Sequence, residues 1–192
     1  MNLYMGSESG LKMGTTPIKL IQKTNYPWAG QIAITLHPET PVSGKIKLRI
    51  PDWCKSYTVK LNGKNLQQKN IESGYLTIDR SWKKDDMILL DLAMPVELVA
   101  ADPRVKDNIG RRAIQRGPIV YCAEQVDNPG VELNSLILSD KNKFKLVDGD
   151  GILKGIKKMQ TTAGKKTITF IPYYAWENRE AGKMIVWMNY KN

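Results

Sequence analysis

The chain has 192 residues, of which 42% are hydrophobic and 25% are charged, and this composition excludes a disordered or fibrous protein. The length allows one large domain or two of about 100 residues, and we expect two. A net charge of +10 is compatible with a nucleic-acid partner, but the Lys and Arg residues are scattered along the chain. Their spacing is typical of solvated strand faces, so we predict no nucleic-acid partner.

No apolar run approaches the roughly 20 residues that a membrane helix needs, so we predict no membrane partner. The N-terminal sequence MNLYMGSESG lacks the basic start and the apolar segment of a signal peptide. The compartment is therefore left open.

Alternating apolar and polar residues predict strands throughout the first half of the chain. The pattern appears in QIAITL (31–36), KIKLRIP (45–51), YTVKLNG (57–63) and GYLTIDR (74–80). Asn62-Gly63 predicts a tight hairpin turn, because both residue types tolerate positive φ. Turn signals every 8 to 12 residues or so indicate antiparallel sandwiches or barrels, and no apolar stripe with helical spacing runs for long.

A candidate domain boundary lies in AADPRVKDNIG (100–110), where a proline and several charges separate two series of strands. The second series contains RRAIQR and IVYCAE, with Gly117-Pro118 as a bend between them, and KTITFIP (166–172). We therefore expect an all-β chain of two consecutive antiparallel β-sandwich domains, residues 1–100 and 101–192.

Cys122 and Glu124 lie two positions apart, so on a strand they point to the same face. A reactive thiolate needs a neighbour that lowers its pKa, and His37 is the only histidine. We interpret Cys122 as a small buried residue of a strand rather than a nucleophile. Cys54 and Cys122 are 68 positions apart, so a single disulfide between them is the less favoured alternative.

No residue group of the chain predicts catalysis or metal binding. One His and two distant Cys cannot form a zinc site, and the common nucleotide-binding and hydrolase motifs are absent. Three carboxylate pairs are interpreted as solvated surface groups: Asp85-Asp86, Asp148-Asp150 and Glu177-Glu180.

Aromatic residues give the one candidate binding function. Trp28, Tyr173, Tyr174 and Trp176 lie beside polar residues, and such rings can stack on sugars in a carbohydrate-binding module. The favoured interpretation is that they fill the core or seal an interface, with sugar binding as the alternative.

Five segments, in this order, resemble the C-terminal part of glycoside hydrolase family 127, which includes β-L-arabinofuranosidases. They are NLYMGSES, KTNYPWAG, LRIPDWCKSYTVKLNGK, GRRAIQRGPIVYCAEQVDN and IPYYAWENREAGKMIVW, and they extend from Asn2 to Trp187. The resemblance implies β-sandwich domains that accompany an N-terminal (α/α)6 barrel, and this chain is expected to lack that barrel.

The resemblance also implies where the chemistry lies. In the family, a zinc-bound cysteine thiolate is the proposed nucleophile and a glutamate is the acid/base, and both belong to the barrel. None of these residues corresponds to Cys54, Cys122 or another position here, so we expect no zinc or other cofactor in this chain and no activity by the chain alone. The expected partners are the barrel and arabinose-containing plant glycans, and self-association into a homo-oligomer is left open.

Overall fold

In a computed structural model, which describes residues 1–67 and 71–191, the chain divides into two compact units, Met1–Met94 and Pro95–Asn192. We call them the N-terminal and C-terminal units. The division lies six residues before the boundary expected from the turn signals. The strand β10 (Val96–Val99), which follows Pro95, pairs with β11 (Arg111–Arg116) of the C-terminal unit.

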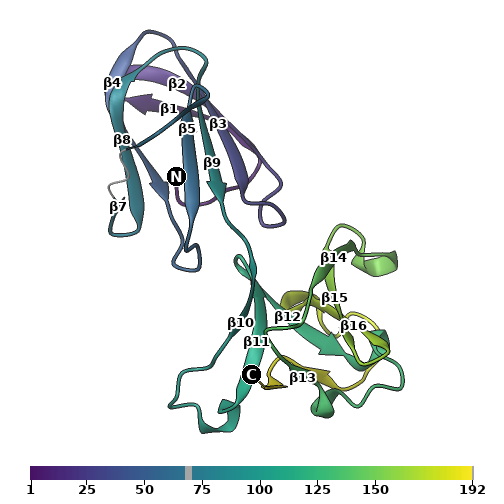
Figure 1. Cartoon of the computed structure of the whole chain (residues 1–192). Coiled ribbons are helices and arrows are strands. Elements are labelled where there is room, and N and C mark those ends of the chain that lie inside the picture. The colour runs from purple at the N-terminus through teal and green to yellow at the C-terminus, as the bar shows by residue number, and fades with distance from the viewer. Residues whose placement is uncertain (68–70, 192) are drawn as a thin grey trace. The chain divides into compact units, whose positions relative to one another are not determined.

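The N-terminal unit consists of two sheets, and most of their strands are labelled in Figure 1. The six-stranded sheet has the order β1 (Ser7–Met13), β2 (Thr16–Thr24), β3 (Gln31–Pro38), β9 (Asp86–Leu92), β5 (Tyr57–Leu61) and β6 (Lys64–Asn65). The three-stranded sheet has the order β4 (Val42–Arg49), β8 (Tyr75–Trp82) and β7 (Ile71–Glu72).

The core of this unit follows directly from the alternating pattern. Ile32, Ile34 and Leu36 of β3 are buried, as are Ile46 and Leu48 of β4, and all belong to one apolar cluster that both sheets line. The intervening Lys45, Lys47 and Arg49 are exposed, as predicted for a solvated strand face. The two sheets therefore form a sandwich around a shared core.

The predicted hairpin at Asn62-Gly63 is confirmed. Both residues have positive φ, 49° and 80°, and Leu61 pairs with Lys64 across the turn. Positive φ at both central residues is the geometry of a type I′ turn, whose twist matches that of the flanking strands.

The C-terminal unit contains nine strands on one connected network. Besides β10 and β11 they are β12 (Ile119–Glu124), β13 (Ile137–Leu138), β14 (Lys145–Asp148), β15 (Lys157–Ala163), β16 (Lys166–Pro172), β17 (Met184–Ile185) and β18 (Met188–Tyr190). All pairs are antiparallel except β13 with β18, which is a short parallel pair. Five short 3-10 helices lie between the strands: Lys106–Asn108, Gln125–Asp127, Leu133–Ser135, Gly151–Leu153 and Tyr173–Ala175.

Strand β12 is central to this unit because successive parts of it pair with three other strands. Ile119 pairs with Arg116 of β11, Cys122 with Ile171 of β16, and Glu124 with Met184 of β17. The end of β12 therefore lies beside segments that are about fifty residues away in sequence.

The all-β prediction is confirmed: no α-helix occurs in residues 1–67 or 71–191. Within those ranges, no helix is long and apolar enough to cross a membrane.

Candidate functional site

Cys122 lies in a small apolar cluster on one face of β12. The residue is fully buried, with Leu153, Ile171 and Ala175 as its buried neighbours in the cluster. Burial, and after it the negative charges of Glu124 and Asp127, raises the pKa of Cys122 to about 12. At neutral pH the thiol is protonated, and a protonated thiol is a poor nucleophile and metal ligand.

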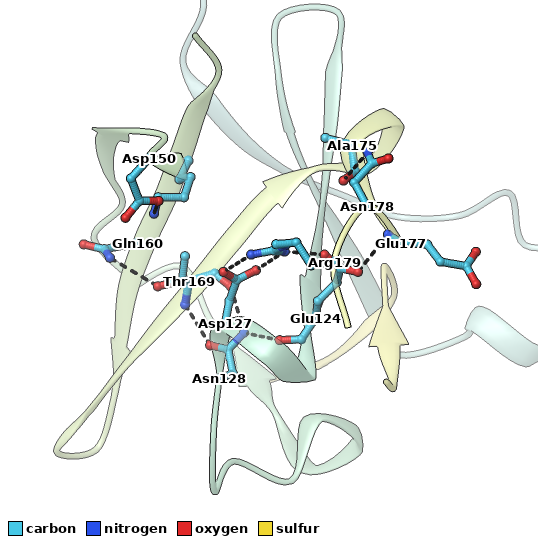
Figure 2. Close-up of polar contacts among 11 residues, drawn as sticks. Glu124, Asp127, Asn128, Asp150, Gln160, Thr169, Ala175, Glu177, Asn178 and Arg179 are labelled. Carbon is cyan, nitrogen blue, oxygen red and sulfur yellow. Dashed lines mark hydrogen bonds and ion pairs between the residues drawn. The ribbon is translucent and has the colours of Figure 1, made fainter. Parts of the chain in front are cut away.

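Glu124 points to the same face as Cys122, as predicted, and it belongs to an ion-pair network at the end of β12 (Figure 2). The Arg179 guanidinium donates to both Asp127 carboxylate oxygens at 2.5 and 2.6 Å, and Arg179 Nη2 also donates to Glu124 Oε2 at 2.5 Å. The three side chains are 18%, 11% and 7% exposed. This bidentate geometry is the strongest form of a carboxylate–guanidinium contact.

The network fixes the charge of Arg179. Hydrogen bonding to Asp127, followed by hydrogen bonding to Glu124, raises the pKa of Arg179 further above its usual value, although burial opposes the shift. Both carboxylates are occupied by this contact. Glu124 and Asp127 therefore act as anchors for Arg179 in this arrangement.

Asn128 holds the end of β12 against β16. Its Nδ2 donates to the carbonyl oxygens of Glu124 (2.8 Å) and Thr169 (2.9 Å), and its Oδ1 accepts from the Thr169 N–H (2.9 Å). The residue is 1% exposed. The amide satisfies three backbone groups that burial would otherwise leave without partners.

Residues 173–183 form a loop between β16 and β17, and we call it the aromatic loop. Tyr173, Tyr174 and Trp176 on this loop are 44%, 62% and 38% exposed. The rings of Tyr173 and Trp176 are parallel within 4°, with their centroids 6.3 Å apart. The structure thus brings together three of the four aromatic candidates on one surface segment.

The fourth candidate, Trp28, lies in the N-terminal unit, in the turn between β2 and β3, where it is half-buried. A surface hollow of about 540 Å³ borders the same turn, and its lining includes Asn25, Ala29 and Gln31. Trp28 and the aromatic loop thus belong to separate units of the fold.

The polar network ties the aromatic loop to β12. The Glu177 N–H donates to Glu124 Oε1 at 2.9 Å, and Asn178 Nδ2 donates to the Ala175 carbonyl at 3.1 Å, as Figure 2 shows. Ala175 is buried beside Cys122. The loop is therefore joined to β12 through Arg179, the Glu177 N–H and the buried Ala175, while its three rings are exposed.

Sequence reasoning missed Asp127, Asn128 and Arg179 as members of this site. Arg179 lies 55 positions from Glu124, and no local pattern connects the two residues. A buried strand that ends in a glutamate is the one signal available, because a buried carboxylate requires a partner.

The carboxylate pairs behave differently from one another. Asp148 and Asp150 form surface ion pairs with Lys157 and Lys158, in agreement with the expected surface role. The same expectation is wrong for Asp86, which is 6% exposed. Asp86 is stabilised there by a hydrogen bond from Asn62 Nδ2 at 2.7 Å, which comes from the β5–β6 turn, and by one from the Lys83 N–H at 2.8 Å.

Both cysteines are free and buried, one in each unit. Among the described residues, no group of three or more His, Cys, Asp or Glu side chains is arranged to hold a metal ion.

Two family models match the chain one after the other. The model of the β-L-arabinofuranosidase GH127 middle domain matches residues 1–94, and that of the glycoside hydrolase family 127 C-terminal domain matches residues 96–189. A non-reducing end β-L-arabinofuranosidase of Bifidobacterium longum subsp. longum is 32% identical over 202 aligned residues, which cover 86% of this chain and 29% of that protein.

Solved structures show the same similarity. A GH127 β-L-arabinofuranosidase from Geobacillus stearothermophilus T6 matches with a TM-score of 0.91 and 36% identity, over 98% of this chain and 33% of that one. The GH127 β-arabinofuranosidase BT3674 matches with a TM-score of 0.88 and 34% identity, over 98% of this chain and 34% of that one. The chain spans about a third of the length of these relatives.

Proposed function

Because the chain belongs to glycoside hydrolase family 127, as its middle and C-terminal domains, we propose that it is the non-catalytic part of a β-L-arabinofuranosidase-like enzyme. In this role the two units pack on a catalytic barrel and stabilise it. The parent enzyme releases terminal arabinofuranosyl residues. The main support is that the two family models together match nearly the whole chain, whereas the chain spans only about a third of the length of its relatives.

The side chains support a non-catalytic role. Cys122 keeps its proton, and Glu124 is committed to Arg179. Cys122 is therefore not an activated nucleophile, and Glu124 is not free to act as an acid or a base.

The test measures hydrolysis of a chromogenic β-L-arabinofuranoside by the purified chain, with the full-length Geobacillus enzyme as the positive control. We expect no release by the chain. Activity that co-purifies with the chain and disappears in Glu124→Gln would contradict the proposal.

A second measurement addresses the supporting role. The barrel of the Geobacillus enzyme, produced without its β domains, is heated with and without this chain in excess. We expect the chain to raise the barrel's unfolding temperature, because a ligand that binds the folded state stabilises it. An unchanged unfolding temperature, together with no detectable complex, would remove the supporting role.

A further inference from the structure

We propose that the aromatic loop, residues 173–183, is a saccharide-binding surface that takes an arabinofuranosyl-containing oligosaccharide on the rings of Tyr173, Tyr174 and Trp176. The choice of sugar rests on the proposed function, whereas the site itself rests on the geometry of the loop. Trp28 is not part of this site.

The parallel, exposed rings offer faces on which the C–H side of a sugar ring can stack. The planes of Tyr173 and Trp176 are parallel within 4°, and both rings remain more than a third exposed. A sugar ring that stacks on one of them lies parallel to the other. Tyr174, 62% exposed, adds a third ring with a hydroxyl group that can donate or accept a hydrogen bond.

Polar groups on the same loop match the chemistry of a sugar. Glu177 and Glu180 are exposed on the same loop, and their carboxylates accept hydrogen bonds, which sugar hydroxyls donate. The centres of protein–protein interfaces are depleted in charged residues. A loop that exposes aromatic rings and two carboxylates therefore favours a polyhydroxylated ligand over an apolar protein surface.

The loop is held in one conformation before any ligand arrives. Arg179 joins it to Asp127 and Glu124, and Glu124 also accepts from the Glu177 N–H. Glu177 has φ of 60°, a conformation that side-chain-bearing residues rarely adopt and that persists where surrounding contacts enforce it. A loop already ordered loses less conformational entropy on binding, so Arg179 is a positioning residue for the rings.

The test uses the whole chain in affinity gels that contain plant arabinan or arabinogalactan, followed by calorimetry with short arabinofuranosyl oligosaccharides. We expect the wild-type chain to be retarded. Trp176→Ala is expected to weaken binding tenfold or more, and Tyr174→Ala, at the most exposed ring, severalfold without loss of folding. Trp28→Phe is the matched control and is expected to bind like the wild type.

Arg179→Lys separates positioning from contact. Lysine keeps the charge and loses the bidentate fork. We expect weaker saccharide binding together with faster hydrogen exchange across residues 173–183, while exchange in the N-terminal unit stays unchanged. Unchanged binding and exchange in Arg179→Lys would overturn the positioning role.

Two outcomes overturn the saccharide site. One is the absence of retardation by every glycan tested, and the other is equal affinity of Trp176→Ala, Tyr174→Ala and the wild type. If the chain binds no glycan but added barrel protects residues 173–183 from exchange, the rings form a barrel contact. Either result leaves the non-catalytic role standing, because that role is tested by hydrolysis and by barrel stability.

Discussion

The N-terminal unit is held by an apolar core that two sheets share, whereas the C-terminal unit adds charged and amide side chains to its apolar core at the end of its central strand. In the first unit Leu90 and Ile34, both fully buried, belong to one cluster with Trp82. In the second, the end of β12 is fixed by Arg179 and Asn128. Apolar contacts tolerate small changes in geometry, but forked ion pairs require their partners in fixed positions. The second arrangement therefore suits a unit that must hold a surface loop in place.

The largest expected effect comes from the core of the N-terminal unit. Leu90→Ala removes a fully buried side chain from β9, between β3 and β5, and is expected to lower the free energy of unfolding by about 4 kcal/mol. Met87→Ala, on the same strand but 39% exposed, is the control and should have little effect. Hydrogen exchange measured separately for the two units checks both variants. A loss of protection confined to the C-terminal unit would show that Leu90 does not stabilise the core of the N-terminal unit.

Arg179→Met is expected to lower the stability of the C-terminal unit by about 3 kcal/mol, because it leaves the buried Glu124 and the partly buried Asp127 without a counter-charge. Denaturant unfolding of Arg179→Met, Glu124→Gln and the double variant gives the coupling between them. We expect the free energy of unfolding to fall in the double variant by much less than the sum of its decreases in the two single variants. Additive losses would show that the network does not act as a unit.

Asn128→Ala removes three hydrogen bonds, one to Glu124 of β12 and two to Thr169 of β16, and is expected to lower stability by about 2 kcal/mol. Asn134→Ala, at an exposed position of the same unit, is the matched control. Equal unfolding temperatures for the two variants would argue against the amide as a structural link.

Cys122→Ser places a hydroxyl in the apolar cluster and is expected to lower stability by about 1 kcal/mol at neutral pH. The pKa of Cys122 is raised to about 12 in the folded chain from 9.0, so the unfolded state loses its proton first. The thiol's contribution is present below pH 9 and is lost as pH rises toward 12. The fall in stability above pH 9 should be shallower in Cys122→Ser, and parallel curves for the two proteins would contradict the buried thiol.

The smallest effect is expected on the acid side, at Asp86 of the N-terminal unit. Burial alone would raise the pKa of Asp86, but hydrogen bonds from Asn62 and the Lys83 N–H, with the charge of Arg80, lower it below the usual value. The ionised Asp86 therefore stabilises the folded state above the unfolded pKa near 3.8, and this stabilisation is lost as the pH falls below that value. Asp86→Asn should cost up to about 1 kcal/mol at pH 7, and the difference from wild type should shrink in acid. A difference that persists unchanged at low pH would exclude ionisation as its cause.

Local patterns predicted much of the fold but little of the site. The alternation of Lys45 to Ile50 and the Asn62-Gly63 turn each contain the information that their structure needs, because strand faces and turn geometry depend on near neighbours. The surface role expected for Asp86 was wrong, since its partner Asn62 comes from another strand end. Tyr173, Tyr174 and Trp176 were visible as candidates, but their parallel arrangement and exposure were not.

The sequence by itself determined that the chain is all-β, that Cys122 and Glu124 share one face of a strand, and that the chain belongs with the β domains of its family. Only the tertiary structure decided that Arg179, on the aromatic loop, meets Glu124 and Asp127, and that three aromatic rings of that loop are exposed. The physical reason is distance along the chain. Side-chain periodicity acts over a few residues. The partner of the buried Glu124 instead depends on the pairing of β12 with β16 and β17, which lie about fifty residues further along the chain.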